Sequence, residues 1–337
     1  MKKAAIITWC NNNGVANYGQ ILQCYAMTRI VREKGYQPLV IRYRRQGGDE
    51  RRWKSAAARG LYELYFEQNL EEKGFHIRKS RFQKFFLTYI PHSAPCYTLE
   101  EVEQAAKDCA LLICGSDQIW NPAAYDPVYY LDFGSERQRR IAFAASMGIT
   151  TVQEQHQPVL EQAAKHLKRL DRISVREQAG AEILQAYTQK KVHTVLDPTL
   201  HLPAEEWDRL ASPRKGKGRY VLCYTLGRLT AGKAAVRRVC EKFGTQRVIL
   251  IATQNTCRGY DGFGEVLYDV SPEDFISLVK YAEAVCTDSF HGVAFSVIYH
   301  KPFCVLERKT EKEWGGGGRI ENLLRVYKGA KELEIGK

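Results

Sequence analysis

The chain has 337 residues, of which 45% are hydrophobic and 26% are charged, and its formal net charge at pH 7 is +12. This composition is ordinary for a globular protein, and the length suffices for two domains with separate hydrophobic cores. No stretch approaches the roughly 18 apolar residues that cross a bilayer, which argues against a membrane-spanning segment. The positive charge favours anionic partners, such as phosphorylated metabolites, nucleotide sugars, anionic lipids or nucleic acid.

The N-terminal sequence MKKAAIITWC places two lysines before a short apolar run. The run is too short for the core of a signal peptide, so we expect a buried strand at 4–8 and a cytoplasmic protein. Ten cysteines are present without a Cys-x-x-Cys pair, which favours buried reduced thiols over a metal or iron–sulfur site. The basic run 42–54 is either a solvated loop or a surface for anionic lipid at the inner face of the membrane.

Short apolar runs without regular alternation recur along the chain, which indicates strands covered on both faces of a parallel sheet. We expect ten of them, at 4–8, 38–43, 110–114, 141–145, 172–175, 194–196, 220–224, 248–251, 284–286 and 303–306. Helical patterns lie between many of these runs, at 18–34, 154–169, 177–187 and 271–283. The alternation predicts an α/β fold with parallel sheets covered by helices.

Ten strands over this length fit two sheets better than one. We therefore expect two Rossmann-like domains, over 1–168 and 169–337. The stretch 55–90 departs from the alternation, because it is helical in pattern and rich in aromatic and basic residues. It is expected to be a helical excursion of the first domain.

Ligands of open parallel sheets bind at the carboxyl ends of the strands, so polar residues just after each strand are candidates for a binding site. After 4–8, the segment WCNNNGVANYGQ carries Asn13, Asn17, Tyr18 and Gly19. Its glycine spacing matches neither the dinucleotide fingerprint nor a P-loop. The segment is either an Asn/Gly turn or a loop that presents a helix N-terminus to an anion or a sugar hydroxyl.

Three further segments follow strands in the same way. LLICGSDQIWNP carries Asp117, whose carboxylate either accepts a proton from a substrate hydroxyl or caps a turn. Arg176 in DRISVREQAG either binds a phosphate or carboxylate or forms an ion pair with a neighbouring acid. Asp197 in VLDPTL is most simply a turn residue.

The segment AVCTDSFHGVAF places His291 in the first turn of a predicted helix that Asp288 or Ser289 caps. The helix dipole favours a neutral imidazole there, whereas a bound phosphate favours the imidazolium form. Gly292 allows a ligand or another backbone to approach closely. In WGGGGRIENLL, four glycines precede Arg319 and form either a surface loop or a loop that orders over substrate.

Seven segments together resemble the polysaccharide pyruvyl transferase family. They are NYGQILQCYAM, ICGSDQIWN, FAASMG, ISVREQAG, VLDPTL, DSFHGVAFS and RIENLL. They occur in the family's order and span almost the whole chain, although residues 45–100 contribute little. In parts of the family Arg-Leu precedes the histidine, where this chain has Ser289-Phe290.

The resemblance implies a GT-B-like architecture, in which two Rossmann-like domains face a cleft. It implies an acceptor side in 1–168 and a donor side in 169–337. The implied reaction moves pyruvate from phosphoenolpyruvate to hydroxyls of a sugar in a cell-surface polysaccharide or a lipid-linked precursor, forming a ketal and releasing phosphate. Phosphoenolpyruvate is then a co-substrate, and no metal ion or other cofactor is expected.

Roles for individual residues follow from this chemistry. His291 is the candidate acid that protonates the methylene carbon, Asp117 is the candidate base, and Arg176 is expected to stabilise the departing phosphate. The expected donor-binding residues are Arg176, Ser289, His291, Gly292 and Arg319. The expected acceptor-binding residues are Asn13, Asn17, Tyr18, Gly19, Ser116, Asp117 and Asn121.

Two other functions are consistent with the same residues. A GT-B glycosyltransferase would use a nucleotide sugar on this architecture. A non-catalytic glycan- or anion-binding relative would bind without turnover, and the Ser289-Phe290 departure motivates that alternative. Nucleic-acid binding is not expected, because the basic run lacks a recognition module.

Overall fold

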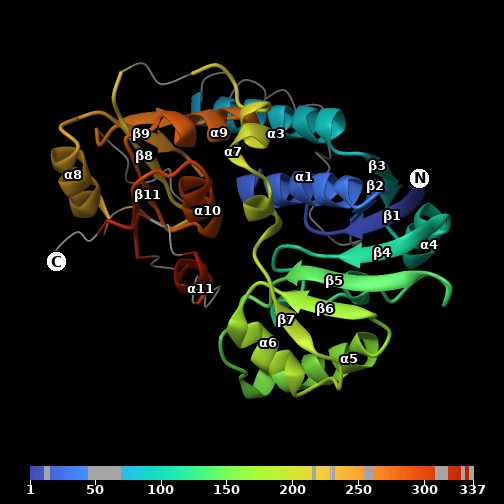
Figure 1. The fold of residues 1–337 in the computed structure, drawn as a ribbon. Helices are drawn as coiled ribbons and strands as arrows, with labels where there is room; N and C mark the ends of the chain where they lie inside the picture. Colours follow the sequence, from blue (N-terminus) through green and yellow to red (C-terminus); the bar gives the residue numbers. More distant parts are fainter. Residues whose placement is uncertain are drawn as a thin grey trace, which may run out of the picture.

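The computed structural model describes residues 1–10, 16–44, 70–214, 218–227, 229, 232–253, 262–307, 318–327 and 331–333. Within these ranges, two sheets of parallel strands alternate with helices (Figure 1). The strands are β1 (Lys2–Ile7), β2 (Tyr36–Tyr43), β3 (His92–Cys96), β4 (Cys109–Cys114), β5 (Arg139–Ala145), β6 (Arg172–Val175), β7 (Val192–Thr194), β8 (Val221–Tyr224), β9 (Val248–Ile251), β10 (Glu265–Leu267), β11 (Ala284–Thr287) and β12 (Phe303–Val305). The α-helices are α1 (Tyr18–Glu33), α3 (Leu70–Tyr89), α4 (Leu99–Ala106), α5 (Gln157–Leu167), α6 (Gln178–Gln185), α7 (Ala204–Asp208), α8 (Lys233–Lys242), α9 (Pro272–Tyr281), α10 (Phe290–Ile298) and α11 (Arg319–Val326).

The strand order of both sheets reverses at one point. The first sheet runs β3-β2-β1-β4-β5-β6-β7 and the second runs β10-β9-β8-β11-β12. The order therefore turns between β1 and β4 in the first sheet and between β8 and β11 in the second, the positions where ligands bind in such sheets. Two parallel, Rossmann-like sheets confirm the expected α/β fold class.

The sheets divide the chain at a different place from the one we expected. Ile141 of β5 pairs with Arg172 of β6, and Ile173 of β6 pairs with Val192 of β7, so both later strands extend the first sheet. The second sheet begins only with β8. The expected boundary at 168/169 is therefore wrong for the sheets, because an apolar run reveals a buried strand without revealing which sheet it joins.

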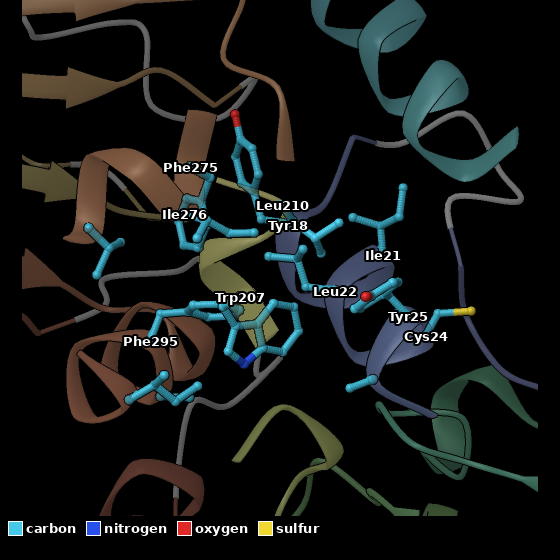
Figure 2. Packing of buried hydrophobic residues seen from close by; sticks show 14 of the residues in the cluster. Tyr18, Ile21, Leu22, Cys24, Tyr25, Trp207, Leu210, Phe275, Ile276 and Phe295 are labelled. Carbon is cyan, nitrogen blue, oxygen red and sulfur yellow. The ribbon is translucent and has the colours of Figure 1, made fainter. Parts of the chain in front are cut away.

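Helix α1 connects the two halves (Figure 1). Its first residue, Tyr18, stacks on Phe275 of α9 at 4.6 Å between ring centroids and meets Tyr224 of β8 edge-on at 5.5 Å. Figure 2 shows Tyr18 and Phe275 together with Trp207, whose ring lies 4.8 Å from that of Phe295 in α10. One hydrophobic cluster thus runs from the first sheet into the second, where we had expected two separate cores.

The expected helical excursion at 55–90 is confirmed for α3, which packs on α1 and α9. The earlier part of this excursion, 55–69, lies outside the described residues. Residues 45–54 of the basic run 42–54 lie outside them too. Contact of that run with an anionic membrane therefore stays a prediction. Among the helices that the structure describes, none combines the length and the apolar composition needed to span a bilayer.

Candidate active site

The residues that we expected to carry chemistry come from both sheets. Ser116 and Asp117 follow β4 after Gly115, Arg176 directly follows β6, and Asp197 follows β7 after two intervening residues. His291 lies in the first turn of α10, just after β11 of the second sheet. All of these residues stand at the carboxyl ends of parallel strands, and β4 and β11 each adjoin the point where their sheet's strand order reverses.

Asp197 is the centre of this group. Its Oδ2 accepts hydrogen bonds from Arg176 Nη1 at 2.6 Å and from Ser116 Oγ at 3.1 Å, and it lies 3.7 Å from His291 Nε2. Its Oδ1 accepts from the backbone amide and the hydroxyl of Thr199, at 2.9 and 2.7 Å. The carboxylate thus joins the candidate arginine of the first sheet to the candidate histidine of the second.

The surroundings of Asp197 and Arg176 favour the charged form of both side chains. Burial raises the pKa of Asp197, but the neighbouring His291 ring, the positive charge of Arg176 and the bond from the Thr199 amide hold that pKa well below its usual range. Arg176 has the larger share of this effect, because it lies 2.6 Å from the carboxylate and His291 Nε2 lies beyond hydrogen-bond distance. Burial lowers the pKa of Arg176, and Asp197, Glu177 and Asp117 more than offset that effect, so its pKa is raised.

Arg176 has further contacts that fix its position. Its Nη2 lies 3.5 Å from Oδ1 of Asp117, and its guanidinium stands 5.1 Å from the ring centroid of Phe290. Asp117 Oδ1 also accepts the backbone amide of Gln118 at 2.8 Å. Arg176 is 3% exposed, so its charge acts inside the protein rather than in bulk water.

The ring of His291 is pressed against the first turn of α1. A Cβ added to Gly19 would lie 2.0 Å from His291 Nδ1, so only glycine leaves room for the ring. Ser289 is the N-cap of α10 and accepts the amide of Gly292 at 3.5 Å, whereas Asp288 accepts the amides of residues 226–227 instead. Gly19 was predicted to bind the acceptor. In the structure its lack of a side chain instead leaves space for the His291 ring.

The positive ends of four helices gather at these residues. The first turn of α1 touches His291, which lies in the first turn of α10. Helix α6 starts two residues after Arg176, and Asn322 in the first turn of α11 donates to the Arg176 carbonyl at 2.8 Å. Helix N-termini carry partial positive charge and free amides, so this convergence favours an anionic ligand.

Arg319 reaches the same region from the last helix. With the Gln118 amide oriented so that its oxygen faces the arginine, Oε1 accepts from Arg319 Nη1 and Nη2 at 2.5 and 3.0 Å. Because Gln118 adjoins Asp117, this contact brings α11 against the loop that follows β4. The predicted residues Asp117, Arg176, Ser289, His291 and Arg319 are thus brought together.

Other predicted residues have structural roles. Tyr18 has no exposed surface, and its hydroxyl donates to the Val270 carbonyl at 2.9 Å, so it packs in the core and an acceptor does not reach it. Asn17 caps α1, and Asn121 caps the short 3-10 helix Pro122–Ala124. Asn13 lies outside the described residues.

Two further predicted residues need comment. Gly292 makes room for Thr287, whose Oγ1 would lie 2.3 Å from an added Cβ, so its small size serves packing rather than ligand approach. Ser116 is fully buried and touches Asp197 instead of an open surface. Ser116 therefore helps to hold the Asp197 carboxylate in place.

The residue that sequence reasoning missed is Asp197. Its interpretation as a turn residue is right for Oδ1, which accepts the Thr199 amide at the start of the 3-10 helix Pro198–His201. The turn interpretation does not account for Oδ2, which accepts a hydrogen bond from Arg176. The position just after a strand was visible in the sequence, but nothing in it showed that the carboxylate would meet an arginine 21 residues away.

Comparison with known proteins identifies the family. The sequence profile of the polysaccharide pyruvyl transferase family matches residues 17–310. The chain belongs to this family. The match includes Asp117, Arg176, Asp197 and His291, and it confirms the resemblance drawn from the seven segments. Family membership supports a transferase that acts on polysaccharide.

Three solved structures show a distant likeness to this pyruvyl transferase family member. S. aureus MnaA with UDP is 14% identical, with a TM-score of 0.49 over 97% of this chain and 87% of that one. The UDP-GlcNAc 2-epimerase of Neisseria meningitidis with UDP-GlcNAc is 12% identical, with a TM-score of 0.48 over 97% and 92%. Anabaena HepE with UDP and glucose is 11% identical, with a TM-score of 0.44 over 98% and 92%. No curated protein matches the sequence.

Proposed function

We propose that the protein transfers pyruvate from phosphoenolpyruvate to hydroxyls of a sugar in a polysaccharide or its lipid-linked precursor, forming a ketal and releasing phosphate. The observation that carries the proposal is the meeting of Arg176 and His291 at one carboxylate, among four helix N-termini. Phosphoenolpyruvate carries a carboxylate and a phosphate close together, and such a ligand calls for cationic and amide donors.

The residues fit the two steps of the reaction. In the first step, an acceptor hydroxyl gives its proton to Asp117 and its oxygen bonds to the central carbon of phosphoenolpyruvate. Protonated His291 gives a proton to the methylene carbon, which becomes a methyl group.

In the second step, another hydroxyl of the sugar bonds to the same carbon and the phosphate leaves. The proton of this hydroxyl returns to His291, and the proton held by Asp117 leaves with the phosphate, so both groups are restored. Arg176 stabilises the negative charge on the departing phosphate. The acceptor is then placed beside Asp117, on the side of the first sheet.

The test is a phosphate-release assay with phosphoenolpyruvate and a panel of hexose acceptors. Loss of the general acid in His291→Ala is expected to lower turnover by about 10²–10⁴-fold. His166→Ala is the matched control, because His166 is a largely buried histidine of α5 that contacts Tyr125 and Asp132 away from the site.

Two results would contradict the proposal. Wild-type turnover in His291→Ala removes the assigned acid. Stabilisation of the protein by UDP- or GDP-sugars, without stabilisation by phosphoenolpyruvate, points instead to a glycosyltransferase.

A further inference from the structure

The carboxylate of Asp197 lies between two groups that both need a counter-charge. Its side chain has no exposed surface, and those of Arg176 and His291 are 2% and 10% exposed. His291 Nε2 is buried and has no hydrogen-bond partner among the described residues. When His291 is protonated, two buried cations therefore face the same Oδ2 atom from opposite sheets.

Removing Asp197 would leave these positive charges with less compensation. Asp117 lies 3.5 Å from Arg176 and is the other carboxylate paired with it, at longer range than the 2.6 Å of Asp197. A buried cation without a close partner is costly, and an anion brought by a ligand relieves that cost. An internal carboxylate and a bound dianion thus act on the same two groups.

We propose that Asp197 is a positioning residue that serves as the internal counter-anion of Arg176 and His291, and thereby limits how tightly the site holds phosphate. The inference rests on the proposed function, in which phosphate is the product that has to leave. Asp197 holds both cations in place before the donor arrives. Its negative charge also opposes the phosphate that remains after transfer.

The experiment is a calorimetric titration of the full chain with inorganic phosphate. Asp197→Asn keeps the size of the side chain and removes its charge. We expect it to bind phosphate at least about fivefold more tightly than the wild type, while its turnover with phosphoenolpyruvate falls at least about 100-fold. Phosphate is also expected to raise the melting temperature of the variant more than that of the wild type.

The matched control is Asp126→Asn. Asp126 is also a buried aspartate that accepts two bonds, from the Tyr43 hydroxyl and the Val128 amide, but it lies away from Arg176. Its variant should keep the wild-type affinity for phosphate. A purely structural role for Asp197 predicts weaker phosphate binding in Asp197→Asn, and unchanged or weaker binding overturns the inference.

A second variant covers the case in which Asp197→Asn folds poorly. Replacing both partners, in Arg176→Gln with Asp197→Asn, removes the uncompensated charge and should restore folding. The double variant should not bind phosphate more tightly than the wild type, because it lacks the Arg176 cation. A double variant no more stable than the single one overturns the pairing. If Asp197→Asn binds phosphate more tightly but the wild type does not consume phosphoenolpyruvate, the proposed function fails and the counter-anion role stands. If the wild type consumes phosphoenolpyruvate but both proteins bind phosphate equally, the counter-anion role fails and the proposed function stands.

Discussion

Gly19→Ala adds a single methyl group and tests whether the position of His291 matters. The added Cβ would lie 2.0 Å from His291 Nδ1, whereas an ordinary contact needs about 3.4 Å, so something has to move by about 1.4 Å. Helix α1 is held by Tyr18, which stacks on Phe275 in the shared core. We therefore expect the imidazole to move.

The expected effect separates catalysis from stability. A displacement of about 1 Å costs on the order of 100-fold in rate when a group has to be aligned for reaction. Alanine favours a helix over glycine by about 0.5–1 kcal/mol, so the free energy of unfolding should fall by less than the steric clash alone suggests. The rate should thus fall much more than the stability.

Turnover is measured as phosphate release from phosphoenolpyruvate, and stability is measured by urea unfolding. Gly180→Ala is the matched control, since it also lies in the first turn of a helix and its added Cβ would meet nothing closer than 3.6 Å. That variant should keep its turnover. Normal turnover in Gly19→Ala would refute the reasoning that places the chemistry at His291.

Three further changes test other parts of the structure. Tyr18→Phe removes the bond to the Val270 carbonyl and should lower the free energy of unfolding by about 1 kcal/mol while turnover stays the same, because Tyr18 is a core residue; a large loss of turnover with normal stability would return it to the acceptor site. Asp288→Asn replaces a carboxylate that accepts two backbone amides, at 2.7 and 2.8 Å, and should cost about 1–3 kcal/mol in urea unfolding, with no measurable loss counting against this anchor. The pKa of Asp197 is lower in the folded protein than in the unfolded chain, so its carboxylate stabilises the protein at neutral pH and that contribution is lost on acidification. Between about pH 5 and pH 3, the wild type should therefore lose stability more steeply than Asp197→Asn, and parallel unfolding curves would contradict the assigned pKa direction.

The sequence was a good guide to the inner strands of both sheets and a poorer one to the edge strands, of which it revealed β7 and β12 but neither β3 nor β10. All ten predicted strands are present, and most were visible because residues covered on both faces have to be apolar. The strand predicted at 194–196 shares only Thr194 with β7, whose residues are partly exposed. The two that were missed, β3 and β10, lie at the outer edges of their sheets and contain exposed residues, so their composition carries little information. The misplaced boundary has a similar cause, since pairing partners are not encoded in the composition of a strand.

The site was partly predictable for the same physical reason. Asp117, Arg176 and His291 stand just after strands, where parallel sheets place ligands, and polar residues there are not needed for packing. Asp197 stands there too, but its role depends on a contact with Arg176, at the end of the neighbouring strand β6, and no local pattern reveals that contact. Tyr18 was wrongly predicted to bind the acceptor. Its hydroxyl group suggested a polar site residue, but its ring packs in the core.

The central claim is that Arg176 and His291 bind the donor together. A crystal structure of the protein with phosphoenolpyruvate tests it most directly. The claim predicts the phosphate within hydrogen-bond distance of the Arg176 guanidinium and the His291 ring, beside the first turns of α1 and α10. A donor bound elsewhere, with Arg176 still held only by Asp197 and Asp117, would contradict it.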